Sequence, residues 1–296
     1  MKPCVWALVA LASAFAVARA QNATILPNGT YQYKTTIAGR EVGRSTIVIR
    51  REGAAIVIEE SSSLAGVALI SERKIEESTF ATLSYEVDAA GKHAAVTIAG
   101  NEATVTQAKR VATISAASDA PFVVSDNMIA GWAQTPATLN ATGEKKLTLA
   151  CLCGGFMAVP IGVVSSRAGT ASLKGADNVA VTLTFDPKTY VLTRMDVPAQ
   201  QASVVLQSQD SKVSALSRPV VATPVPLPPA RYTSRDVSIR TDDGVTLAGT
   251  LTIPNSATAP LPGFVFVHGS GCIDRDESIG PNKVFAQLAN RLSNDG

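Results

Sequence analysis

Stretches in which apolar and polar residues alternate fill most of the chain up to about residue 209. An alternation with a period of two is typical of half-buried β-strands, and turns that contain glycine separate one stretch from the next. The alternation predicts strands at residues 31–36, 45–51, 54–60, 81–87, 94–99, 104–108, 111–116 and 202–207. A β-hairpin is expected where 179–185 and 190–195 flank the turn-favouring pair Asp186 and Pro187. We expect antiparallel meanders that form a curved sheet or sandwich, with a helical turn at 126–132.

The pattern changes at residues 218–230, which contain five prolines. A run so rich in proline favours an extended linker and cannot lie inside a sheet. Beyond it, 235–240 and 245–253 flank an Asp-Gly turn and predict a second hairpin. Residues 264–267 are apolar on both faces, as is typical of a buried parallel strand. In 282–292 the apolar residues recur at helical spacing, which predicts an amphipathic helix.

The first twenty residues have the three parts of a secretory signal peptide. Lys2 supplies the positive charge, an apolar stretch follows, and Ala18-Arg19-Ala20 is a cleavage site of the A-x-A type. The apolar stretch is shorter than the roughly 20 residues that a membrane span needs, so a membrane anchor is the weaker interpretation. We expect a secreted or periplasmic protein that is cleaved near Ala20 and has no membrane span.

Charge and cysteine content narrow the classes of partner. The net charge is +2 and no basic stripe is present, so nothing indicates a nucleic acid partner. Of the cysteines that would remain after cleavage, Cys151 and Cys153 stand two apart and Cys272 is distant. Their spacing is not that of a zinc site and no histidine is near, so we expect no metal and no cofactor. Small buried side chains are the favoured interpretation of these cysteines.

Few polar residues in the β-rich part are candidates for catalysis. His93 follows a glycine turn and has no nucleophile or acid pattern around it, so we expect a solvated turn residue. Glu59 and Glu60, and likewise Asp126 and Asn127, are interpreted as polar positions at strand ends.

The strongest candidate site follows the apolar residues 264–267. It consists of a turn of His268, Gly269, Ser270 and Gly271, followed by a charged run of Asp274, Arg275, Asp276 and Glu277. Backbone N–H groups in a tight turn can face the negative oxygen that develops during acyl transfer, and the glycines permit unusual dihedral angles. The charged run is either the rim of a pocket or a plain solvated loop.

These residues, in this order, resemble the start of a secreted bacterial α/β-hydrolase of the serine aminopeptidase S33 and dienelactone hydrolase type. The resemblance covers about the last fifth of the chain and rests on the hairpin at 243–251, the turn at 268–271, the charged run, residues 280–283 and the helix at 285–289. It implies that Ser270 or Gly271 donates to the oxyanion and that His268 orders the turn. Ser270 is not expected to be the nucleophile, because the G-x-S-x-G pattern is not met around it. The implied reaction is transfer of an acyl group from a small-molecule or peptide substrate to water.

The expected fold class is therefore a mainly β N-terminal domain, an antiparallel meander or sandwich, plus the truncated start of an α/β-hydrolase domain. The expected organisation is a signal peptide at 1–20, a β-rich accessory domain at 21–217, a linker at 218–230 and the hydrolase segment at 231–296. In that family the nucleophile, acid and base follow the oxyanion turn, so this chain is expected to be a fragment without a catalytic triad and inactive as it stands. The alternative is a non-catalytic secreted binding module with a vestigial hydrolase tail.

Overall fold

One large sheet dominates the protein. The computed structural model describes residues 23–64, 66–89, 92–116, 121–125, 129–143, 145–151, 157–175, 178–219, 226–258, 260–267, 274–279 and 282–295. Most of them belong to a sheet of fifteen strands, and the others include two small two-stranded sheets and two α-helices.

The strands of the large sheet follow one another along the chain and are mostly joined by short turns. They are β1 (Gly29–Ile37), β2 (Arg40–Glu52), β3 (Ala55–Leu64), β4 (Val67–Glu76), β5 (Thr82–Ala89), β6 (Lys92–Ala99), β7 (Glu102–Gln107), β8 (Arg110–Ser115), β9 (Phe122–Ser125), β10 (Lys146–Cys151), β11 (Met157–Arg167), β12 (Thr170–Lys174), β13 (Ala180–Phe185), β14 (Leu192–Val197) and β15 (Ala202–Asp210). Two antiparallel meanders, β1 to β8 and β10 to β15, are joined where β1 pairs with β15. Among the described residues, β9 and β10 form the single parallel pair.

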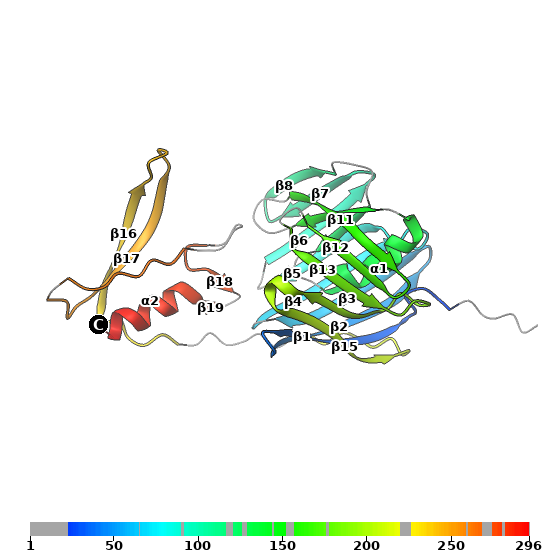
Figure 1. Ribbon diagram of the computed structural model, residues 1–296, viewed down its shortest axis with the longest axis horizontal. Coiled ribbons are helices and arrows are strands. Elements are labelled where there is room, and N and C mark those ends of the chain that lie inside the picture. The colour runs from blue at the N-terminus through cyan, green and yellow to red at the C-terminus, as the bar shows by residue number, and fades with distance from the viewer. Residues whose placement is uncertain are drawn as a thin grey trace, which may run out of the picture.

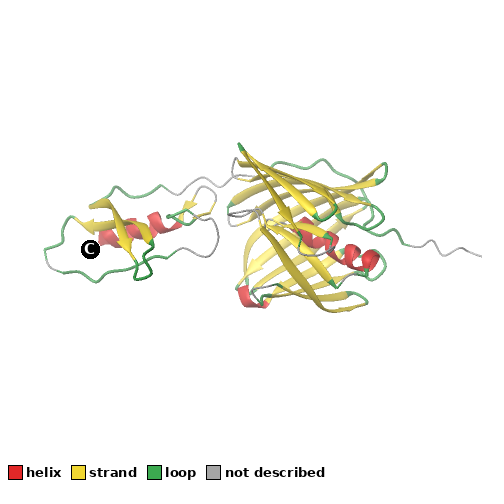
Figure 2. Ribbon diagram, turned by 90° about the horizontal axis from the view of Figure 1, so that it is seen from above, coloured by secondary structure: helices red, strands yellow, loops and turns green. Residues whose placement is uncertain are grey.

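The sheet is strongly curved and its strands surround the helix α1 (Ile129–Thr142), as Figure 2 shows. The helix packs near β3 of the first meander, β13 and β14 of the second, and the edge strand β9. Nearly all of α1 is buried, including polar residues such as Gln134, Thr135 and Thr138. The helix therefore lies inside the curve of the sheet and is not a surface helix with one wet face.

The core lies between α1 and the concave face of the sheet. Large side chains on β1 to β3 alternate inward because successive residues of a strand point to opposite faces. They include Tyr31, Tyr33, Ile47, Ile49, Ile56 and Ile58, and they share one cluster with the alanines of α1. A second cluster, on β5 to β10, contains Tyr85, Val96, Val105 and Phe122.

The C-terminal residues form a separate group of small elements. They are the hairpin of β16 (Tyr232–Arg240) and β17 (Thr246–Pro254), the two-residue strands β18 (Ser278–Ile279) and β19 (Asn282–Lys283), and the helix α2 (Val284–Asp295). Figure 1 shows the hairpin and α2 to one side of the large sheet. The hydroxyls of Thr252 and Ser293 lie 2.8 Å apart and tie α2 to β17.

The fold class expected from the sequence is wrong. The structure is a fifteen-stranded, mostly antiparallel sheet with two α-helices in the described residues, and the described residues after 226 form no α/β-hydrolase domain. The expectation depended on a buried parallel strand at 264–267, but these residues form no strand and are exposed. Phe264 and Val265 are 70% and 86% exposed, because the small C-terminal elements offer no sheet for this segment to join.

The individual strands predicted from the sequence agree with the structure better than the predicted fold class does. The eight strands predicted from the alternation correspond to β1, β2, β3, β5, β6, β7, β8 and β15. The two predicted hairpins are β13–β14 and β16–β17, and the predicted amphipathic helix is α2. The helical turn expected at 126–132 is the fourteen-residue helix α1, while β4 and β9 to β12 were not predicted.

The chain that leaves β15 follows the large sheet before it reaches the prolines. The Thr30 hydroxyl donates to the Lys212 carbonyl over 2.8 Å, and the Ser61 hydroxyl donates to the Ser217 carbonyl over 2.6 Å. Residues 226–230 are in no regular secondary structure. The domain boundaries at 217 and 231 stay a prediction. In the described part of the chain, no helix is long and apolar enough to cross a membrane.

Candidate functional site

The oxyanion turn that the sequence predicts, His268 to Gly271, lies outside the described residues, and so does Cys272. The charged run that follows the turn is described. Three of its side chains, those of Asp274, Arg275 and Asp276, are exposed or partly exposed and form hydrogen bonds with residues of the C-terminal elements. These partners show what the run does locally.

Asp274 organises the charged run. Its carboxylate accepts the backbone N–H groups of Asp276 and Ser278 over 3.1 and 3.0 Å. Hydrogen bonds from Ser278 and from the Asp276 backbone stabilise the charged form, so the pKa of Asp274 lies below its usual value. This residue is therefore a charged turn former at neutral pH.

Arg275 connects the run to the hairpin. Its guanidinium donates to Asp236 on β16 over 2.6 Å and to the Thr250 hydroxyl on β17 over 2.7 Å. Asp276 pairs with Lys283 over 3.1 Å. Neither of the two pockets described below is lined by these charges, and the rim of a pocket and a solvated loop both stay predictions for this run.

His93 lies on β6 opposite Asp88 of β5. Its Nδ1 is 3.2 Å from Asp88 Oδ1, and both side chains are more than half exposed. A serine becomes a nucleophile when a base accepts its proton, and in the described part of the chain no hydroxyl is hydrogen-bonded to His93. The pair is a solvated surface contact, as expected from the sequence.

The described residues with the most unusual environment lie under the first turn of α1. Glu60 is fully buried, and its two carboxylate oxygens accept the backbone N–H groups of Ile129 and Ala130 over 3.3 and 2.7 Å. The Ser62 hydroxyl also donates to Glu60. A carboxylate is favoured at a helix N-terminus because unpaired N–H groups and the helix dipole both attract negative charge. The interpretation of Glu60 as a strand-end residue is wrong, because it lies inside β3 on the concave face.

Arg73 of β4 extends this buried polar group. It is fully buried, donates to Gln134 of α1 over 2.9 Å and lies 4.9 Å above the ring of Tyr85. Burial lowers the pKa of the Arg73 guanidinium, while the nearby Tyr85 and Glu60 oppose the shift. Gln134 in turn donates to Thr82 and to the Phe80 carbonyl. No periodic pattern along the chain predicts this group, since its members come from β3, β4, β5 and α1.

The described residues of the large sheet line at least two pockets. One, of about 330 Å³, lies where the C-terminal half of α1 meets the β11–β12 and β13–β14 turns. The other, of about 290 Å³, is lined by Glu59, Glu72, Glu86 and Asp88, with Arg218 from the following chain. Arg50 contacts two of these carboxylates, Glu59 and Glu72. No group of three or more histidine, cysteine, aspartate or glutamate residues suited to a metal ion is found among the described residues.

Comparison with known proteins gives one informative similarity. The chain is 35% identical over 100 residues to esterase EstD of Thermotoga maritima. The matched part is 32% of this chain and 23% of the esterase, so the chain spans about a quarter of the relative's length. No family model matches the chain.

Proposed function

We propose that this chain belongs to an exported hydrolase that acts on ester bonds. The observation that carries the proposal is the 35% identity over 100 residues to an esterase, which suggests hydrolase activity. The large sheet does not carry it, because a fold alone does not specify a reaction. The chemistry must be argued from a site.

The site that fits ester hydrolysis is the turn of His268, Gly269, Ser270 and Gly271. Attack of a serine on an ester carbonyl places a negative charge on the carbonyl oxygen, and fixed N–H groups stabilise that charge. In the proposed mechanism the backbone N–H of Ser270 or Gly271 supplies this stabilisation. The Asp274 turn and the Arg275 contacts with the hairpin support it by holding the chain that leaves the turn.

The test separates the backbone of this turn from its side chains. The natural protein is purified from the cells that produce it, and the turnover of short-chain p-nitrophenyl esters is measured. Gly271→Pro removes one N–H group and should lower kcat about 100- to 1000-fold if that group is the donor. Ser270→Ala keeps its N–H group and should leave kcat within a few-fold.

Either of two results would overturn the assignment. One is unchanged activity in both Gly271→Pro and Ser270→Pro, since each variant removes one of the two candidate N–H groups. The other is complete loss of activity in Ser270→Ala, which would make Ser270 the nucleophile. Circular dichroism of each variant checks that the turn substitutions have not unfolded the protein.

The 296-residue chain by itself should not turn over these esters. The described residues bring no serine, histidine and carboxylate together, and His93 has only Asp88 beside it. An oxyanion turn stabilises charge only after a nucleophile has created it. Turnover above background by the purified 296-residue chain would contradict this prediction.

Export is part of the same proposal and has its own test. The A-x-A site predicts a mature N-terminus at or within about two residues of Gln21. Expression in a Gram-negative host, followed by N-terminal sequencing of the periplasmic protein, measures it. An uncleaved N-terminus on correctly folded protein would contradict export by this route.

A further inference from the structure

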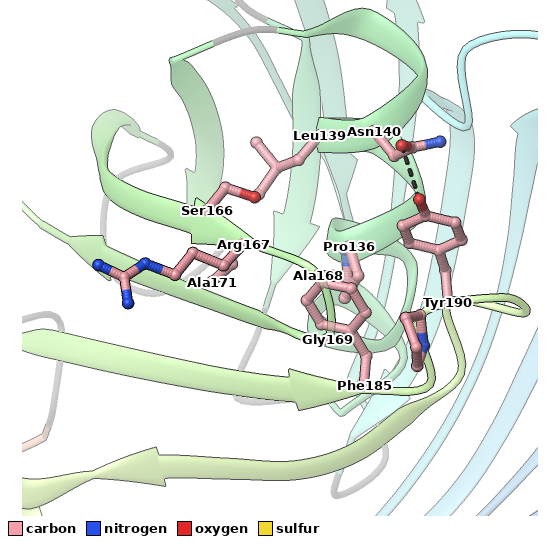
Figure 3. A pocket seen from close by; sticks show the side chains of 11 residues that line it. Pro136, Leu139, Asn140, Ser166, Arg167, Ala168, Gly169, Ala171, Phe185 and Tyr190 are labelled. Carbon is pink, nitrogen blue, oxygen red and sulfur yellow. Dashed lines mark hydrogen bonds between the residues drawn. The ribbon is translucent and has the colours of Figure 1, made fainter.

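The pocket at the C-terminal half of α1 has the size and shape of a small-molecule site. Figure 3 shows its lining, in which Pro136, Leu139 and Asn140 come from α1 and the remaining residues come from the two turns and their strands. Its volume is about 330 Å³. A cavity of about 150 Å³ with apolar walls can hold benzene, so this pocket has room for one or two rings.

One wall of the pocket is flat and apolar, while Asn140, Ser166 and Arg167 make other parts of the lining polar. The rings of Phe185 and Tyr190 stack with their centroids 5.6 Å apart and their planes 22° from parallel. Leu139, Pro136 and Ala171 complete the apolar lining. An aromatic ligand gains both area and ring contacts against such a wall.

One end of the pocket is polar. The Tyr190 hydroxyl donates to Asn140 Oδ1 over 2.7 Å, which holds the amide in place (Figure 3). An amide nitrogen carries two donor hydrogens. Within the described residues, Asn140 Nδ2 donates to no protein group, so it can donate to a ligand acceptor.

The two turns beside the pocket have positive φ angles and internal hydrogen bonds. Tyr190 has a positive φ of 58°, which is rare for a bulky residue, and Gly169 has a φ of 82°. Asp186 accepts the N–H groups of Lys188 and Thr189 over 2.9 and 2.8 Å and closes the β13–β14 turn. A non-glycine residue held at positive φ costs free energy and recurs at ligand sites, where the surrounding structure enforces it.

We propose that this pocket binds a small, flat, uncharged molecule that carries one hydrogen-bond acceptor, such as an aryl ketone or a simple aryl ester. The rings take the flat part and Asn140 donates to the acceptor. A charged ligand fits less well, because Arg167 is the one charged side chain of the lining and extends away from the ring pair (Figure 3). Nothing in this site requires turnover, so it is a binding site that is independent of ester hydrolysis.

The test compares two probes of the same shape. Acetophenone has an acceptor oxygen and ethylbenzene has none, and each is titrated into the ¹⁵N-labelled protein while amide signals are followed by NMR. Acetophenone should shift the signals of Asn140, Gly169 and Tyr190 and should bind about three- to tenfold more tightly than ethylbenzene, as one added hydrogen bond implies. In Asn140→Ala the two probes should bind equally.

A matched pair of variants locates the site. Ala168→Trp fills the pocket from the β11–β12 turn and should reduce acetophenone binding at least tenfold. Ala54→Trp places the same side chain in the β2–β3 turn, also exposed and also beside a glycine, and should leave binding unchanged. Shifts that avoid the pocket, equal binding of the two probes by the unaltered protein, or undiminished binding in Ala168→Trp would each overturn the proposal.

Discussion

Two adjacent glutamates have opposite environments. Glu60 is fully buried against α1, while its neighbour Glu59 lies on the convex face and is within 3.4 Å of Arg50. The difference follows from the alternation of side chains along a strand. Two consecutive glutamates therefore supply one buried carboxylate that holds α1 and one carboxylate on the surface.

Replacing each glutamate in turn should reveal this difference in stability. Glu60→Gln removes the charge that accepts two helix N–H groups and places an amide donor against them, so the free energy of unfolding should fall by about 2–3 kcal/mol. Glu59→Gln alters an exposed ion pair and should cost less than about 1 kcal/mol. Urea unfolding of both variants measures the difference. Equal losses would mean that Glu60 does not anchor α1.

The Asp186 carboxylate should contribute to stability in a pH-dependent way. Hydrogen bonds from the Thr189 and Lys188 backbones stabilise its charged form, so its pKa in the folded protein is lowered. A lowered folded pKa gives stability that is complete above the unfolded value, about 3.9, and is lost as the pH falls through the folded value. Asp186→Asn should therefore be about 0.5–1 kcal/mol less stable at pH 7 and equally stable at strongly acidic pH. Thermal unfolding between pH 7 and pH 2 measures this, and an unchanged difference at pH 2 would contradict it.

The sequence predicts the strands and helices whose buried positions are apolar. It does not predict those in which polar side chains occupy buried positions. In β4 the buried positions include Ser71 and Arg73 as well as Leu69 and Ile75, so the apolar alternation is broken. Ten of the fourteen residues of α1 are buried, polar ones among them, and the helix contains Pro136, so it shows no single apolar stripe. The buried polar group around Glu60 has the same cause, because its residues meet only when four elements pack together.

The apolar run at 264–267 shows the converse error. Its composition predicts a buried strand, but a strand needs hydrogen-bonded neighbours and the C-terminal elements provide none. Phe266 instead packs on Phe285 of α2, with ring centroids 5.3 Å apart. The turn at 268–271 that follows is proposed as an oxyanion site from the sequence alone, since its glycines and histidine are adjacent in the chain.

Arg275 should be the residue that fixes the charged loop to the β16–β17 hairpin. Arg275→Ala removes the contacts to Asp236 and Thr250, so amide hydrogen exchange in residues 274–279 should accelerate about threefold, as an exposed ion pair implies. Arg235→Ala, an exposed position on β16, serves as the control and should not change exchange there. Exchange that is equally fast in both variants and in the unaltered protein would show that the loop is held by other contacts.

The two parts of the molecule differ in how much apolar surface they bury. The large sheet encloses two apolar clusters, whereas the C-terminal elements leave Val265 and Val267 86% and 79% exposed. In that part the buried residues of α2 are Asn290 and Ser293, both polar. Ordering a residue costs roughly 1–2 kcal/mol of backbone entropy, which so little burial cannot offset. The C-terminal elements should therefore open far more readily than the sheet.

Limited proteolysis of the whole chain measures this difference. Trypsin should cut first between Arg218 and Arg240 or beyond, because Arg231, Arg235 and Arg240 are exposed, and it should leave a resistant fragment that contains β1 to β15. Because exposed apolar residues promote association, a chain that ends at Ser217 should also remain soluble at higher concentration than the whole chain. If residues 232–295 instead resist trypsin for as long as the sheet does, the C-terminal elements are stabilised by packing that their exposed apolar surface does not suggest. The boundary expected at the proline-rich segment would then be wrong.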